Sequence, residues 1–534
     1  MDDNRQTQIA RLLSRYPIIL VIIGGLLGAV AVGSWAGSGD FKKVAMVIGG
    51  CATFAAVMQL GEKYWMMIPF AFTFQLHAIP YGHTSIELPE IVICVCTATF
   101  IARYALKLQK FTLFRASHVP VLLYVAWAML IFVNYPVGLA QEGATTGGAR
   151  FYAKILMALA SFLVMANQNI TQRDCRWIAA LVIVGSFFQA AQGIFLFFYG
   201  GTYGGGVSEA DITDPDSYYS WHQNLGVGPV AVVSMIFSRY KGSEMFSVKR
   251  PWIVPILFAC LVLVLLSGKR VGIISFPLCA ISAALIRKEW GFLMFWIGGA
   301  LLAMALLILG HGSVFTLPLT AQRALTWLPA QWDSQLASYK GGADPFRERM
   351  RELAMDRIKR DPWIGRGYQV DLKMVNQAFA AERNSWEGLC VSLAIGSQWH
   401  NTWFGDAADF GIPASVLQAV ILLQVILLGL WLFKRLPGGS SMQTIAFYVL
   451  LITIRDVAGS WHSGHSAEGP FGRYWMYGML VSLVVMVKAG SAQEKRPVEE
   501  SNPPSLGGFR RPLPGGFREP RARPVLHRAG RDVR

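Results

Sequence analysis

Long apolar runs constrain the fold of this chain more than any other feature of its sequence. Residues 17–36 (PIILVIIGGLLGAVAVGSWA) and 291–310 (GFLMFWIGGALLAMALLILG) contain no charged side chain. A helix of about 20 apolar residues crosses the hydrocarbon core of a bilayer. Charged residues make up only 15% of the chain, whereas soluble domains carry about 25%. The sequence therefore predicts an all-α polytopic membrane protein, and it excludes a soluble enzyme and a disordered protein.

Hydropathy along the chain predicts about 12–14 transmembrane helices. The apolar segments lie near 17–36, 44–60, 64–79, 88–106, 118–138, 151–166, 177–199, 222–238, 251–267, 271–286, 291–310, 413–433, 442–458 and 472–488. The loops rich in lysine and arginine then fall on one side of the membrane, which the positive-inside rule assigns to the cytoplasm. Both termini are predicted on that side.

The predicted spans divide the chain into four regions. Residues 1–310 hold the N-terminal transmembrane helices, residues 311–399 a large outer loop, residues 400–488 the C-terminal transmembrane helices, and residues 489–534 a basic tail. The tail is rich in proline, glycine and arginine. It is therefore predicted to be disordered in the cytoplasm, and to contact anionic lipids rather than nucleic acid.

The outer loop is far longer than a typical connection, which indicates a functional cap. Apolar residues recur in it at helical spacing and predict an amphipathic helix over 345–360. These residues are Phe346, Met350, Leu353, Ala354 and Ile358. Arg347 and Arg349 fall in the first turn of that helix, where the helix dipole disfavours a cation. Their position indicates an anionic ligand.

A second pair of cations follows a tight turn, Ser267-Gly268-Lys269-Arg270, that is predicted on the outer face. Two cations there depart from the positive-inside bias. Such a pair can extend its side chains toward lipid headgroups. Cations at membrane depth are nevertheless costly and tend to mark a functional site, and we favour that interpretation.

The order and placement of several motifs resemble the bacterial O-antigen ligase and O-antigen polymerase superfamily. His400-Asn401, followed by Asp409 and Gly411, is similar to its His-Asn…acid-x-Gly signature. The other similar positions are Arg347, Ala354, Ile358, Pro362, Gly365 and Gly367 in an Arg-to-Gly-x-Gly run, Ser267 to Arg270 in a Ser-Arg-Gly turn, and Asn224-Leu225-Gly226 at the start of a middle span. The resemblance covers roughly residues 150–435. The chain departs from the pattern at Arg351, where the family has an aromatic residue, and in its Lys-Arg-Val turn.

The resemblance implies a GT-C-like fold in the bacterial inner membrane and glycosyl transfer at its periplasmic face. The implied donor is a glycan on undecaprenyl diphosphate, the acceptor is a hydroxyl of another glycan or a lipid, and no metal or cofactor is required. Arginine suits such a leaving group because its guanidinium forms paired hydrogen bonds to phosphate oxygens. Arg270 and Arg347 are the implied catalytic arginines, and His400 is the base that accepts the acceptor proton.

Six further residues are candidates for substrate binding: Lys269, Arg349, Arg366, Asn224, Asn401 and Arg455. Asn401 has an alternative role as the cap of the following helix. Asp409 lies nine residues after His400, about 13 Å along a straight helix, so the two are not predicted to form a dyad.

Two alternative functions remain open from the sequence. The first is a flippase or transporter of lipid-linked oligosaccharides, although the polar signals gather on one face rather than at the midplane. The second is a protein O-oligosaccharyltransferase within the same superfamily. Ligase and polymerase are not separated by these motifs.

Overall fold

The computed structural model describes most of the hydrophobic part of the chain. The described residues are 57, 59–74, 77–81, 84–113, 115–137, 148–203, 225–268, 270–326, 328–368, 390–391, 394, 399, 401–460 and 468–494. The predicted span 17–36, most of the predicted span 44–60, most of the basic tail, and the candidate residues Asn224, Lys269 and His400 lie outside them. The chain forms two compact units, Met1–Lys488 and Ala489–Arg534, and the description below concerns the first.

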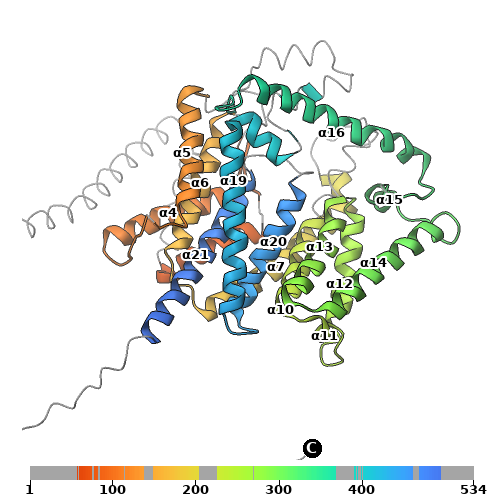
Figure 1. Cartoon of the computed structure of the whole chain (residues 1–534), viewed down its shortest axis with the longest axis horizontal. Helices are drawn as coiled ribbons and strands as arrows, with labels where there is room; N and C mark the ends of the chain where they lie inside the picture. The colour runs from red at the N-terminus through yellow and green to blue at the C-terminus, as the bar shows by residue number, and fades with distance from the viewer. Residues whose placement is uncertain are drawn as a thin grey trace, which may run out of the picture. The chain divides into compact units, whose positions relative to one another are not determined.

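This unit is nearly all helical (Figure 1). Its helices are η1 Gly61–Met66, α3 Met67–Phe74, α4 Leu88–Ala105, α5 Val119–Asn134, α6 Ala149–Ala166, α7 Gln172–Tyr203, α10 Val227–Arg239, α11 Gly242–Met245, α12 Ile253–Leu266, α13 Arg270–Arg287, α14 Trp290–Gly310, α15 Leu319–Leu325, α16 Ser334–Arg360, α19 Thr402–Arg435, α20 Ser441–Gly459 and α21 Glu468–Glu494. Strands β1 His77–Tyr81 and β2 Thr84–Glu87 pair as a short antiparallel hairpin.

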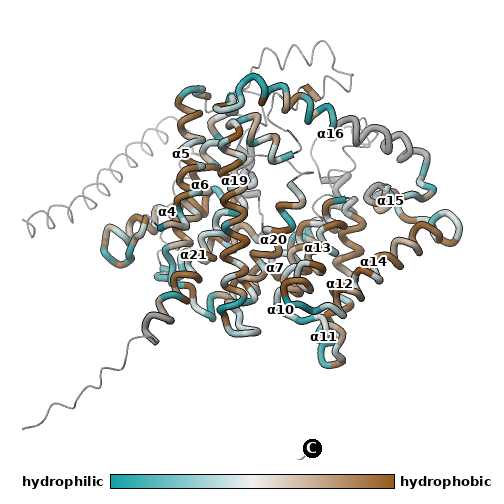
Figure 2. The backbone as a smooth tube through the Cα atoms, viewed as in Figure 1, coloured by the Kyte–Doolittle hydropathy of each residue, from teal (hydrophilic) through white to brown (hydrophobic). Residues whose placement is uncertain are grey.

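The helices of the described part confirm an all-α polytopic membrane protein. Eight of them are long and apolar enough to cross a bilayer, and α5, α10 and α12 are shorter apolar helices. Helix α14 is apolar along its whole length (Figure 2), and only 6% of its span is buried inside the protein. Leu301, Leu302 and Leu306 of α14 are exposed. A surface of this kind is stable only where lipid surrounds it.

Three elements differ from the expected boundaries. The predicted span 64–79 is divided between η1, α3 and β1, so it is not one long helix. Helix α16 begins at Ser334 rather than at residue 345, and α19 begins at Thr402 rather than at residue 413. In α19 the sequence analysis missed a short helix before Gly411, whose positive φ of 78° and the following Pro413 break the helix.

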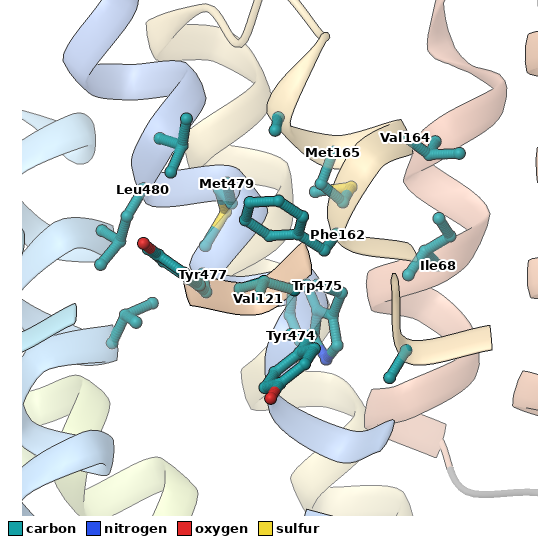
Figure 3. Close-up of a cluster of buried hydrophobic side chains, with 14 of the residues drawn as sticks. Ile68, Val121, Phe162, Val164, Met165, Tyr474, Trp475, Tyr477, Met479 and Leu480 are labelled. Atoms are coloured by element: carbon teal, nitrogen blue, oxygen red, sulfur yellow. The ribbon is translucent and has the colours of Figure 1, made fainter. Parts of the chain in front are cut away.

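The main core lies between α21 and the helices that flank it. Figure 3 shows Tyr474, Trp475 and Tyr477 of α21 beside Phe162 and Met165 of α6. The rings of Phe162 and Tyr477 are 5.0 Å apart. Close approach of the two helices depends on Gly478, because a Cβ there would overlap the carbonyl of Phe162. Small residues at such crossings allow membrane helices to pack by van der Waals contact.

A second and a third cluster support the elements that carry the candidate site. The second is formed by α10, α12, α13 and α20 and includes Phe237, Cys279 and Phe447. The third joins the apolar stripe of α16 to α19 and the residues before it. Its members are Met350, Ala354, Ile358, Cys390, Ala394, Trp399, Ala407 and Ala408. The apolar stripe predicted on α16 therefore packs against α19 and the residues before it.

Candidate functional site

Backbone contacts fasten the end of α16 to the break in α19. The Gly367 N–H donates to the Asp409 carbonyl at 2.6 Å, and the Ile412 N–H donates to the Pro362 carbonyl at 2.8 Å. Gly365 and Gly411 have φ of 65° and 78°, and a Cβ on either would overlap a carbonyl of the facing segment. Only glycine fits this geometry without strain. We call these contacts, together with Arg357 and Trp399, the clamp.

A buried ion pair closes the clamp. Arg357 Nη2 lies 3.6 Å from Asp409 Oδ1, and the two side chains are 15% and 0% exposed. The same Arg357 nitrogen donates to the Gly367 carbonyl at 3.1 Å, and its guanidinium lies over the Trp399 ring at 5.5 Å. Trp399 Nε1 donates to Asp409 Oδ1 at 3.1 Å. The Gly-x-Gly and acid-x-Gly motifs, considered separately in the sequence, thus form one structural unit.

Asp409 fixes the residue just before His400. His400 and Asp409 are separated by nine positions and were not predicted to form a dyad, which stays a prediction. The indole of Trp399 instead reaches Asp409 directly. The sequence signal for this contact is an aromatic residue just before the short helix and an acidic residue at its end, two positions before Gly411.

Asn401 caps α19. Its side-chain oxygen accepts from the N–H groups of Trp403 and Phe404 at 3.1 and 3.2 Å, which satisfies two donors that a helix start leaves unpaired. Thr402 N–H donates to the carbonyl of Ser460 at 3.0 Å, just after the end of α20. The alternative role predicted for Asn401 is therefore the one observed, and its contact with substrate stays a prediction.

Arg270 begins α13 at this same end of the helices, which we call the Asn401 end. A Cβ on Gly459, the last residue of α20, would lie 3.6 Å from the Val271 side chain, and one on Gly226 would lie 2.8 Å from Ser267 Oγ. The segment after Asn224 and the Ser267 turn are thus neighbours. Arg270 Nη2 donates to Thr326 Oγ1 at 2.7 Å, just beyond α15.

Arg455 belongs to a group of ionised side chains near the end of α20. Arg455 Nε donates to Asp456 Oδ1 at 2.9 Å, and Arg473 Nε lies 2.9 Å from Asp456 Oδ2. The Arg455 and Arg473 side chains are 24% and 23% exposed. We call Arg455, Asp456 and Arg473 the arginine cluster. Sequence analysis identified Arg455 as a binding candidate but missed the carboxylate that it shares with Arg473.

Asp406 is a further residue that sequence analysis missed. It is buried on the short helix before Gly411. Both carboxylate oxygens lack a hydrogen-bond partner among the described residues, as does the buried hydroxyl of Tyr124. Asp409 and Arg473 are the charged groups that act on it electrostatically. An acid inside an apolar segment is the sequence signal that could have identified it.

The remaining candidate arginines lie on α16 and after it. Arg347 is half-buried, Arg349 pairs with Glu352 at 2.9 Å, and Arg366 pairs with Asp361 at 3.1 Å. Because α16 begins at Ser334, Arg347 and Arg349 lie in its interior, and the expected position in the first turn is wrong. The helix dipole acts only near a terminus, so it no longer indicates a ligand at these two residues.

The predicted convergence of Arg270 and Arg347 on one diphosphate stays a prediction. Within the described residues, no group of three histidine, cysteine, aspartate or glutamate side chains is placed to hold a metal ion.

The comparison with known families agrees with this geometry. Residues 255–419 match the model of the O-antigen ligase family. The matched segment begins in α12, includes the Arg270 turn, α16 and the clamp, and ends in α19. No curated protein matches the chain. Together, these findings show a polytopic membrane protein in which residues 255–419 are similar to the O-antigen ligase family, and they support the resemblance seen in the motifs.

Proposed function

We propose that the protein transfers a glycan from undecaprenyl diphosphate to an acceptor hydroxyl at the periplasmic face of the inner membrane. The family supports glycosyl transfer of the O-antigen ligase or polymerase type. The finer assignment rests on one observation. Arg270 and the arginine cluster lie at the Asn401 end, the end that also carries the residues on either side of His400.

The charge of the arginine cluster suits an anionic leaving group. Its hydrogen-bonded groups are two guanidiniums and one carboxylate. One positive charge is therefore not balanced within the cluster, and both arginines are partly accessible. Guanidinium groups bind phosphate oxygens in pairs, and such contacts catalyse when they strengthen as charge develops.

The reaction then needs one proton acceptor. The acceptor oxygen attacks the anomeric carbon, and its proton passes to the neutral imidazole of His400. The bond between the anomeric carbon and the phosphate oxygen breaks, and the electron pair leaves with the diphosphate. Arg270, with Arg347 as its predicted partner, stabilises that charge. Lys269, Arg349, Arg366 and Asn224 are proposed contacts to the sugars or the phosphates.

The proposed reaction requires the Asn401 end to face the periplasm. The positive-inside bias then puts both chain termini in the cytoplasm, with the basic tail near anionic lipid. Natural Cys390 is buried, so labelling must use introduced cysteines. Glu348→Cys on α16 and Lys249→Cys in the loop before α12 are both at exposed positions. We expect a membrane-impermeant thiol reagent to label only the first in intact spheroplasts, and labelling of only the second would reverse the orientation.

The proposed reaction is tested with purified protein in detergent. Incubation with a lipid-linked glycan and an acceptor glycan should release undecaprenyl diphosphate and yield a longer or transferred glycan. A flippase would leave the donor chemically unchanged, because detergent removes the second compartment. The exposed Arg360→Ala variant on α16 is the matched control and should retain the wild-type rate.

A deletion strain distinguishes the two family activities. Loss of a polymerase leaves surface glycans of one repeat unit, whereas loss of a ligase leaves a long glycan on its lipid carrier. If protein-linked glycans disappear and both polysaccharide profiles stay normal, the protein is an O-oligosaccharyltransferase.

A further inference from the structure

A large pocket lies at the opposite end of the helices from the candidate site. Its volume is about 1040 Å³, and it is lined by the ends of α10, α13, α19 and α20, the start of α14, and α11. Helix α19 runs from the Asn401 end to Phe433, which lines the pocket. The loops here carry the basic residues that predict the cytoplasmic side of the membrane.

Positive charge dominates the lining. The cations are Arg239, Lys241, Arg250, Arg287 and Lys288, and the acids are Glu244 and Glu289. Only Arg250 forms an ion pair with one of these acids, at 2.7 Å from Glu244. Glu289 accepts from the backbone N–H of Gly242 at 2.8 Å and so fixes α11.

Two arginines of the lining, Arg239 and Arg287, are held in place by uncharged acceptors. Arg239 donates to the Gly439 carbonyl, and Arg287 donates to the carbonyls of Tyr240 and Ser238. Carbonyl oxygens orient a guanidinium without adding a negative charge, and Glu289 and Glu244 act on Arg287 through space only. Lys241 and Lys288 are exposed and form no ion pair with any residue that the structure describes. The pocket therefore has fixed cations and two accessible ammonium groups.

Aromatic side chains surround the mouth of this pocket. Phe246, Trp290 and Phe295 line it and are each more than half exposed. The rings of Phe246 and Phe295 are 5.1 Å apart. Exposed aromatic rings are typical of the boundary between the bilayer and water. A free phosphate ion would use the cations alone, whereas a lipid would use the cations and the rings together.

We propose that this pocket binds an anionic phospholipid of the cytoplasmic leaflet, with its phosphate among the cations and its chains against the aromatic rings. Basic pockets between membrane helices on this side recognise anionic headgroups. The site is separate from the candidate active site, and the proposal does not depend on the reaction assigned there.

Native mass spectrometry of the full-length protein in detergent tests the site. The probes are dioleoyl phosphatidylglycerol and dioleoyl phosphatidylethanolamine, which differ in headgroup charge. We expect the anionic lipid to be retained preferentially, and the double variant Lys241→Gln/Lys288→Gln to bind it more weakly by on the order of tenfold, because each cation near the headgroup contributes to the attraction. Both lysines are exposed, so the fold should be kept.

The matched control removes two equally exposed lysines outside the pocket. Lys249→Gln/Lys434→Gln lowers the net charge of the same face by the same amount and should retain wild-type lipid binding. Equal loss in both double variants would show general electrostatic attraction and overturn the site. Equal retention of the two lipids by the wild type would also overturn it. If glycerol 3-phosphate competes as strongly as the lipid, the ligand is a soluble phosphate compound and the lipid assignment is wrong.

Discussion

The clamp and the arginine cluster both join helices through buried charges, but their charges balance differently. In the clamp, Arg357 faces one carboxylate, Asp409, which is 0% exposed. In the arginine cluster, Arg455 and Arg473 share Asp456, and both arginines retain some exposure. A balanced, enclosed pair has no charge left for a ligand, whereas an accessible excess of cations attracts an anion. Charge balance thus separates residues that hold the fold from residues that we propose bind the substrate.

The largest effect on the reaction is expected at His400, the proposed base, which follows Trp399 of the clamp in the sequence. His400→Gln should lower turnover about 100–10,000-fold, the usual contribution of a general base, while donor binding and folded yield stay near wild type. Because protonated imidazole cannot accept a proton, the wild-type rate should fall as the medium is acidified through the range in which histidine titrates, and the variant should lack this fall. Single-turnover rates across pH measure both. Unchanged turnover with a raised acceptor KM would make His400 a binding residue.

Substitutions in the clamp should lower the free energy of unfolding rather than the rate of the chemical step. Asp409→Asn leaves Arg357 buried without its carboxylate, and breaking a buried pair in this way destabilises a protein by about 3–5 kcal/mol. Thermal unfolding in detergent measures the loss. Asp361→Asn is the control because it breaks an exposed pair with Arg366, worth about 0–1 kcal/mol.

A double substitution of the ion pair in the clamp provides a second test of its structural role. Replacing both partners, as Arg357→Met/Asp409→Leu, removes the unpaired charge and should restore part of the stability. A normally stable Asp409→Asn protein with low turnover would mean that Asp409 acts in the reaction, and the distinction between clamp and arginine cluster would fail.

Arg270 should behave as a substrate-binding cation although it also bonds Thr326. Arg270→Ala removes a preorganised donor from the leaving group and should lower turnover roughly 100–1,000-fold at normal abundance. Arg270→Lys should restore little, because an ammonium lacks the paired donors of guanidinium. Thr326→Val isolates the structural part, since it removes the bond of 2.7 Å and keeps the cation. If Thr326→Val reduces the rate as much as Arg270→Ala, Arg270 only holds α15.

Arg455 gives a smaller and more specific effect. In Arg455→Met, Asp456 and Arg473 form a balanced pair like that of the clamp, so the donor should bind roughly 10–100-fold more weakly, as expected for a lost charge-assisted hydrogen bond. Folded yield should change little because Arg473 still pairs Asp456. Donor KM against turnover is the measurement. A stability loss as large as that of Asp409→Asn would assign the arginine cluster to the scaffold.

Asp406 provides the smallest test of the comparison. Neither oxygen of its buried carboxyl group has a hydrogen-bond partner among the described residues. Burial without a partner disfavours a charged carboxylate, so Asp406→Asn, which keeps the side-chain shape, should leave the donor KM close to the wild-type value. A clear fall in the donor KM would show that Asp406 carries a charge that offsets the arginines.

Much of the fold was predictable because apolar length alone identifies membrane helices. The spans at α4, α6, α13, α14, α20 and α21 lie close to their predicted positions. The break at Gly411 was missed because hydropathy does not register a positive φ, and the start of α16 was missed because its first half carries no regular apolar stripe. Arg270 was selected because two cations in an outer turn depart from the positive-inside bias, and Arg455 was selected as a candidate substrate contact. Asp456 was missed because only tertiary folding brings Arg473 to its carboxylate.

The break at Gly411 divides α19 into two arms. Its long arm, residues 412–435, is the membrane span, and its short arm, residues 402–410, begins beside His400. Both ends of the short arm are braced, by Ser460 at one end and by the Gly367 N–H at the other. These two bonds hold the short arm at both ends, so we expect it to keep its position. In the proposed reaction, the lipid-linked donor would then diffuse within the bilayer to an acceptor site that is already formed.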